Sequence, residues 1–143
     1  MKPHGAKFEY EQQRNEDLMR AYQELVRESK CITTNIYRKI VDMPSLRFWV
    51  SPERAAIVIA SIMKGDKLSY MRNNKREMFR EIYKRAMEIR KKLPNLTILE
   101  TASIVVEQPA PKFYLTPGYA EIIVGKIKKQ CYERTKQRLR HLF

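Results

Sequence analysis

Two short segments of the chain place a basic residue beside an aromatic one. In an extended segment, alternate side chains share a face, so Arg47 would lie next to Trp49, and Lys112 next to Tyr114. A cation can bind a phosphate group while the neighbouring ring stacks on a base or sugar. We therefore predict that these four residues bind nucleic acid. The alternative is that the aromatic residues of both segments belong to the core and the basic stems cover them.

Two further groups of basic residues could contact phosphates. The helical period over residues 75–92 places three of them in a stripe, at Arg76, Arg80 and Lys84. Glutamates nearby leave open that this stripe is an ordinary solvated face with salt bridges. The second group lies near the C-terminus, between residues 126 and 140, where Glu133 is the one acidic residue. Seven basic residues of this segment are predicted to bind nucleic acid: Lys126, Lys128, Lys129, Arg134, Lys136, Arg138 and Arg140. For this group the alternative role is solubilising charge.

The residues needed for catalysis are scarce. His4 and His141 lie near opposite ends of the chain, and its four glycines form no phosphate-binding loop. No Asp, Glu, His or Cys residues have the spacing of metal ligands. We predict a non-enzymatic protein with no catalytic residues, metal, cofactor or small-molecule substrate.

The elements that must position these residues occur twice. Residues 41–64 align with residues 106–129 at an offset of 65, with eight of the 24 positions identical, both prolines among them. Upstream, the apolar helical pattern that begins at Leu18 returns at Phe79, at an offset of 61. We predict an internal duplication of a unit of roughly 60 residues, in a mainly α fold.

Each predicted unit consists of a helix, a second helix, an extended segment and a third helix. The second helices are expected at 33–42 and 97–107, and the third helices begin at Ser51-Pro52 and Thr116-Pro117, where a hydroxyl cap precedes proline. Asn74 with Glu77 resembles a capping box for the first helix of the second unit. The two extended segments could pair as a short two-stranded ribbon.

The predicted organisation is a flexible arm at 1–13, a first repeat at 14–65 and a second repeat at 66–143 with a basic C-terminal helix, the repeats sharing one body. Of the 29 Lys and Arg residues, 18 follow residue 65, and the net charge is +13. From the charged N-terminus we expect no signal peptide, and from the short apolar runs we expect no membrane span. We therefore expect a cytoplasmic protein with reduced cysteines, and no membrane partner.

Residues 47–55 (RFWVSPERA) and 109–118 (PAPKFYLTPG) carry a resemblance to a family. They resemble small uncharacterised proteins of bacteriophages and mobile elements of gut bacteria, over most of the chain after Asn15. The resemblance implies a bacterial or phage cytoplasmic setting, and it implies no activity or site residues.

Two classes of function fit the sequence. We predict a nucleic-acid-binding protein, for DNA more than RNA, that acts as a regulator or as a packaging or replication accessory. Tandem helix-turn-helix modules are a weaker comparison, because about nine residues separate the second and third helices where three or four are usual. The alternative is an assembly module that oligomerises, or binds a host protein, through apolar third helices such as residues 52–64. A continuous basic surface would favour the first class and an exposed apolar patch the second.

Overall fold

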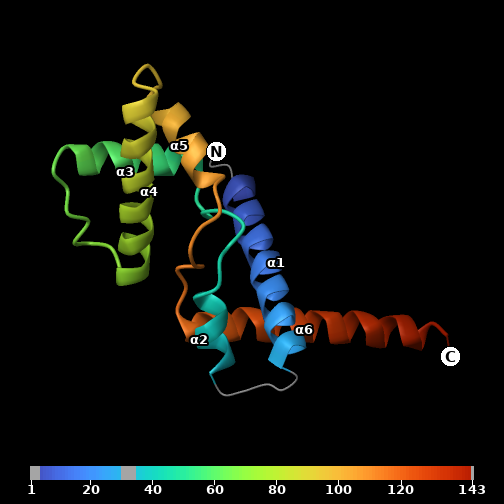
Figure 1. Ribbon diagram of the computed structural model, residues 1–143. Coiled ribbons are helices and arrows are strands. Elements are labelled where there is room, and N and C mark those ends of the chain that lie inside the picture. The colour runs from blue at the N-terminus through green and yellow to red at the C-terminus, as the bar shows by residue number, and fades with distance from the viewer. Residues whose placement is uncertain (1–3, 30–34, 143) are drawn as a thin grey trace.

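The fold is built from α-helices. The computed structural model describes residues 4–29 and 35–142, and these ranges contain helices and no β-strand. The mainly α prediction is therefore confirmed. In chain order the helices are α1 (His4–Ser29), α2 (Ile36–Val41), α3 (Pro52–Met63), α4 (Asn73–Lys92), α5 (Ile98–Val106) and α6 (Pro117–Arg140) (Figure 1).

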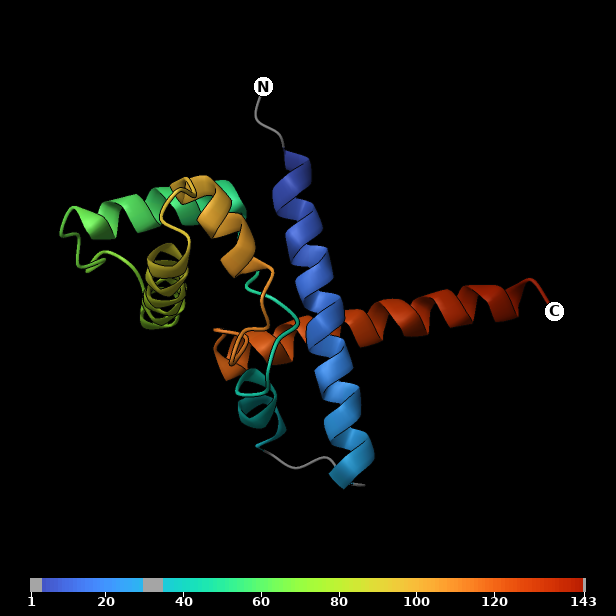
Figure 2. The same ribbon diagram turned by 45° about the horizontal axis from the view of Figure 1, so that its top comes forward.

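The helices pack in two groups of three. Helix α3 packs against α4 and α5, whereas α6 packs against α1 and α2 (Figures 1 and 2). Each group therefore takes one helix from the other half of the sequence: α3 joins α4 and α5, and α6 joins α1 and α2. Helices from both sides of the predicted boundary between residues 65 and 66 therefore pack in each group, so this boundary does not separate the two groups.

The starts of α3 and α6 follow the predicted capping chemistry. The Ser51 side chain accepts a hydrogen bond from the Arg54 N–H, and Thr116 does the same for the Tyr119 N–H, with a proline in the first turn of each helix. Helix α3 ends before Gly65, whose φ of +102° is in the left-handed region that glycine tolerates. These signals fix where the extended segments stop.

One predicted helix cap is wrong. Asn74 is no cap, because α4 begins at Asn73 after Arg72, which makes no side-chain capping bond. The capping box is at Thr97 and Glu100, at the start of α5.

The predicted flexible arm at 1–13 is instead helical from His4 onward. Of the predicted second helix at 33–42, residues 33 and 34 lie outside the described ranges, and α2 covers Ile36–Val41.

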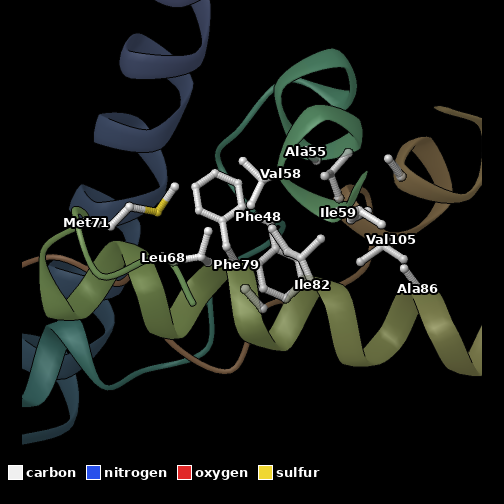
Figure 3. Close-up of a cluster of buried hydrophobic side chains, with 13 residues drawn as sticks. Phe48, Ala55, Val58, Ile59, Leu68, Met71, Phe79, Ile82, Ala86 and Val105 are labelled. Carbon is white, nitrogen blue, oxygen red and sulfur yellow. The ribbon is translucent and has the colours of Figure 1, made fainter. Parts of the chain in front are cut away.

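The buried side chains form one cluster in each group of helices. Phe48 joins Phe79 and Ile82 among α3, α4 and α5 (Figure 3). Phe113 joins Leu18 and Ala21 among α1, α2 and α6. Each extended segment thus inserts one ring into the core, and Phe48 and Phe113 are 1% and 4% exposed.

The two extended segments, one between α2 and α3 and the other between α5 and α6, cross at a single antiparallel bridge. Ser45 and Ala110 exchange backbone hydrogen bonds of 3.0 Å each. On either side, the Phe48 N–H donates to the Val106 carbonyl, and the Phe113 N–H donates to the Val41 carbonyl, both at 3.0 Å. The segments therefore meet at one bridge, and among the described residues they form no ribbon.

Candidate nucleic-acid interface

A buried carboxylate holds the first extended segment in place. The Asp17 side chain on α1 is 1% exposed, and its carboxylate accepts hydrogen bonds from the Ser45 hydroxyl (3.0 Å) and the Leu46 N–H (2.9 Å). It also forms an ion pair with Arg20 at 2.6 Å. The Ser45 hydroxyl oxygen in turn accepts a hydrogen bond of 2.8 Å from the Trp49 indole N–H. This chain of bonds orients Trp49.

Arg47 lies between the rings of Tyr10 and Trp49, and the sequence pattern predicted its place beside Trp49. Its guanidinium is 5.5 Å from the centre of the Trp49 ring and 5.0 Å from that of Tyr10 on α1. It also donates to the Phe48 carbonyl at 3.1 Å and the Val50 carbonyl at 3.4 Å. Among the described residues its charge has no carboxylate partner.

The second segment repeats this pairing with a different balance of charge. The Lys112 ammonium lies 5.4 Å from the centre of the Tyr114 ring and forms an ion pair with Glu77 of α4 at 2.6 Å. Tyr114 stacks on the buried Phe48 ring, with 6.2 Å between ring centres. Burial, with a smaller contribution from Glu81, raises the pKa of Tyr114 to about 12. Lys112 is thus partly neutralised, and Tyr114 is largely a packing residue.

Four basic residues line a cavity where the segments meet. Its volume is about 190 Å³, and its basic lining residues are Arg14, Arg47, Lys75 and Lys112. Arg14 comes from α1 and Lys75 from the first turn of α4, so both long helices contribute. The offset of 61 between the two long helices in the sequence also relates Arg14 to Lys75.

Two larger cavities share lining residues with this one. One, of about 580 Å³, is lined by Tyr10, Trp49 and Arg54 among others. The other, of about 670 Å³, is lined by Arg72, Tyr70 and Tyr119 among others. We call the three cavities together the central cleft. Among the described residues the side chains of Arg54, Arg72 and Lys75 form no ion pair, so their charges are available to a ligand.

Helix N-termini add to the positive potential of the cleft. Ser51 caps α3 and lines one outer cavity, while Thr116 caps α6 and lines the other. Asn74, in the first turn of α4, also lines the second cavity. The N-terminal end of a helix carries a partial positive charge.

A groove between α1 and α6 continues the cleft. Arg14 lines both the cleft and this groove, where it stacks on Tyr119 with its guanidinium carbon 5.6 Å from the ring centre. Further along, Lys126 and then Arg134 line the connected hollows, which share Ile127. Nine basic and two acidic residues line the cleft and the groove, so the net charge of the lining residues is positive. We call this continuous surface the basic track.

The C-terminal half of α6 extends beyond the rest of the molecule. In both views α6 runs past α1, and its end has no other helix beside it (Figures 1 and 2). We call residues 129–140 the α6 arm, where every residue is exposed. Successive helical residues turn by about 100°, so its basic side chains form two groups on opposite sides of the helix, Lys129, Lys136 and Arg140 on one side and Arg134 and Arg138 on the other. All five are among the residues predicted to bind nucleic acid.

Lys126 and Lys128 precede the arm in different settings. Lys126 is exposed and lines the α1–α6 groove. Lys128 donates a hydrogen bond to the Tyr22 hydroxyl and lies 4.3 Å from the centre of that ring. Lys128 therefore helps to fasten α6 onto α1.

The predicted stripe on α4 does not belong to the track. Arg76 donates to the carbonyls of Leu68 (3.2 Å) and Met71 (2.7 Å), and Arg80 donates to the Lys67 carbonyl at 3.5 Å. Both side chains therefore support the loop between α3 and α4, whose Leu68 has a positive φ of 56°. Lys84 is exposed and lines none of the cavities of the track.

Several residues of the cleft were absent from the predicted site. Tyr10, Arg14, Tyr70 and Tyr119 come from elements whose packing the sequence does not specify. Arg14 had a usable signal, because the offset of 61 pairs it with Lys75. The tyrosines had none, since exposed and buried tyrosines look alike in sequence.

No protein-family model matches the chain, and comparisons with curated proteins and with solved structures also find no match. Within residues 4–29 and 35–142, no helix is long and apolar enough to cross a membrane, and no group of His, Cys, Asp and Glu could hold a metal ion. The residues of the basic track are therefore the main indication of function.

Proposed function

We propose that the protein binds nucleic acid along the basic track and the α6 arm. The observation that carries this proposal is the continuity of positive charge from the central cleft, through the α1–α6 groove, to an exposed basic helix. Arg54, Lys75 and Arg72 keep their charges unpaired among the described residues, at the cost of mutual repulsion. A polyanion would relieve this repulsion and release its own counterions.

DNA is the proposed target, and RNA is the alternative. A cytoplasmic role as a regulator, or as a packaging or replication accessory of a phage or mobile element, is proposed from the family resemblance of residues 47–55 and 109–118. We propose a non-enzymatic role, because the sequence offers few residues suited to catalysis. Binding and assembly of a nucleic-acid complex would be the whole activity.

Binding affinity as a function of salt tests this proposal. We would measure the affinity of the full chain for labelled duplex DNA, single-stranded DNA and RNA between 50 and 200 mM salt. A variant with Arg134, Lys136 and Arg138 changed to glutamine removes three charges from the α6 arm. Its matched control changes Lys64, Lys91 and Lys92, which are exposed at the ends of α3 and α4 away from the cleft.

The proposal predicts a linear fall of log affinity with log salt, whose slope the arm variant lowers by about 2 to 3 and the control leaves unchanged. Equal slopes in both variants would remove the arm from the interface. If none of the three nucleic acids binds at the lowest salt, the proposal is wrong.

We also propose that the chain is an internal duplication whose third helices are exchanged. Two backbone hydrogen bonds support this, from the N–H of residue 48 to the carbonyl of residue 106 and from the N–H of residue 113 to the carbonyl of residue 41. The two donors are 65 residues apart in the sequence, and so are the two acceptors. A second support is that Arg20 and Arg85, one on each long helix, donate to the carbonyls of Pro44 and Pro109. A symmetric pair of units would create such a repeated set of contacts.

Assembly through the third helices is the second candidate function. Ile57 on α3 and Ile122 on α6 occupy positions 65 residues apart and are 59% and 53% exposed. Such isoleucines could lie in an oligomer seam. Sedimentation of the wild-type chain and of an Ile57→Ser, Ile122→Ser double variant tests for such a seam. If the seam exists, the wild-type chain should be an oligomer and the double variant a monomer.

A further inference from the structure

We infer that the central cleft takes a single strand of nucleic acid, with a backbone phosphate in the middle cavity and bases in the two outer cavities. This inference rests on the proposed function and specifies the ligand of the same site. It follows from the size of the cavities and from which side chains line each one. All three cavities have aromatic rings in their lining, and the smallest has the most basic residues.

The middle cavity fits a phosphate. At about 190 Å³ it is the smallest of the three, and the charged groups lining it are Arg14, Arg47, Lys75 and Lys112, with no acid. Lys112 is partly neutralised by Glu77, which leaves three cations without a carboxylate partner among the described residues. A phosphodiester there would accept charge-assisted hydrogen bonds from arginine and lysine.

The outer cavities fit bases. Their volumes, about 580 and 670 Å³, are larger than the middle one, and each contains aromatic rings at its surface. Trp49 and Tyr10 line one, while Tyr70 and Tyr119, which are 67% and 45% exposed, line the other. Bases of any identity stack on such rings, so binding should tolerate many sequences.

A duplex does not fit this arrangement. Its bases are stacked and paired inside, and its phosphates lie on a convex outer surface. A duplex could therefore contact the exposed α6 arm but could not bring base faces onto Trp49. Only an unpaired strand can place a phosphate and its two neighbouring bases in three adjoining cavities.

Trp49 is the only tryptophan of the chain, so its fluorescence reports the cleft directly. We would titrate the full chain with oligomers of deoxythymidine and of uridine of about twelve nucleotides, and with a hairpin duplex of equal phosphate number. The expected result is quenching of Trp49 by the single strands and no quenching by the duplex. The two single strands together separate DNA from RNA.

Two exposed residues of the cleft test the two kinds of contact. Tyr119→Ala removes a stacking surface and Lys75→Ala a phosphate contact, whereas the control Lys91→Ala removes the same charge at the far end of α4. The cleft variants should weaken single-strand binding about tenfold, the low end of the range for base stacking, and the Lys91 control should not. Helical circular dichroism verifies that all three variants fold.

The outcomes separate this inference from the proposed function. Duplex binding equal to single-strand binding, with no change in Trp49 fluorescence and no effect of the cleft variants, would overturn the inference while nucleic-acid binding stands. Quenching by single strands that Tyr119→Ala or Lys75→Ala weakens would support both. If no oligomer binds, both are wrong.

Discussion

The carboxylate of Asp17 is the group whose removal should most disturb the crossing of the two extended segments. It is buried on α1 and accepts hydrogen bonds from the Ser45 hydroxyl and the Leu46 N–H, in addition to its ion pair with Arg20. Asp17→Ala removes these acceptors together. Because Ser45 also bonds Trp49, the change should be felt at the candidate site.

The loss in the free energy of unfolding should be about 3 kcal/mol. Breaking a fully buried ion pair costs about 3–5 kcal/mol. Here the Arg20 side chain is 35% exposed and can be hydrated again, and the Ser45 hydroxyl can still donate to the Arg47 carbonyl at 2.9 Å. The Leu46 N–H, whose bond to Asp17 is partly buried, loses its acceptor, which keeps the loss above that of a surface contact. Asp17→Asn, which retains one acceptor oxygen, should lose about 1–2 kcal/mol.

Urea unfolding followed by Trp49 fluorescence and by circular dichroism measures these differences. Glu24→Ala is the control, because Glu24 also pairs with Arg20 (3.0 Å) but is 45% exposed, and it should lose about 0.5 kcal/mol or less. The corresponding fall in the midpoint of thermal unfolding for Asp17→Ala is about 6–12 °C. A loss for Asp17→Ala no larger than that for Glu24→Ala would refute the role assigned to this carboxylate.

Three further predictions follow from individual contacts. Because the pKa of Tyr114 is raised from 10 to about 12, the folded chain holds this proton more tightly than the unfolded chain. The free energy of unfolding should therefore fall as pH rises from 10 to 12. The urea midpoint of Tyr114→Phe should fall less than that of the wild type over this range, and an equal fall would contradict the assignment. Arg76→Ala should cost about 1–2 kcal/mol in urea unfolding and leave the salt slope of binding unchanged, since its bonds go to loop carbonyls; a changed slope would return Arg76 to the interface. Proteolytic cleavage at a site placed at Ser69, between α3 and α4, should give two fragments that still elute together, because each fragment supplies a helix to the other's group; separation in native buffer would contradict the exchange.

Local signals in the sequence predicted the helices well. The hydroxyl-proline pairs at Ser51 and Thr116 act through neighbouring atoms only, and both caps are present. Periodicity likewise placed Leu18 and Phe79 in the core. The misplaced cap at Asn74 shows the limit of a local pattern, because the same residue types can lie inside a first turn.

Spatial relations between distant segments could not be read from the sequence. Nothing in residues 52–63 indicates that α3 packs on α4 and α5 rather than on α1 and α2. The same holds for the candidate site. Arg47 beside Trp49 was predictable from alternation, whereas Arg14 and Tyr119 meet only because α6 packs against α1.

Photochemical cross-linking of the full chain to a labelled single-stranded oligonucleotide, followed by peptide mapping, tests most directly whether nucleic acid binds along the basic track. The proposal predicts cross-links in peptides that contain Trp49, Tyr119 and the α6 arm, and their loss as salt is raised. Cross-links confined to the far ends of α3 and α4, around residues 61–67 and 88–96, would contradict it, as would the absence of any cross-link at low salt.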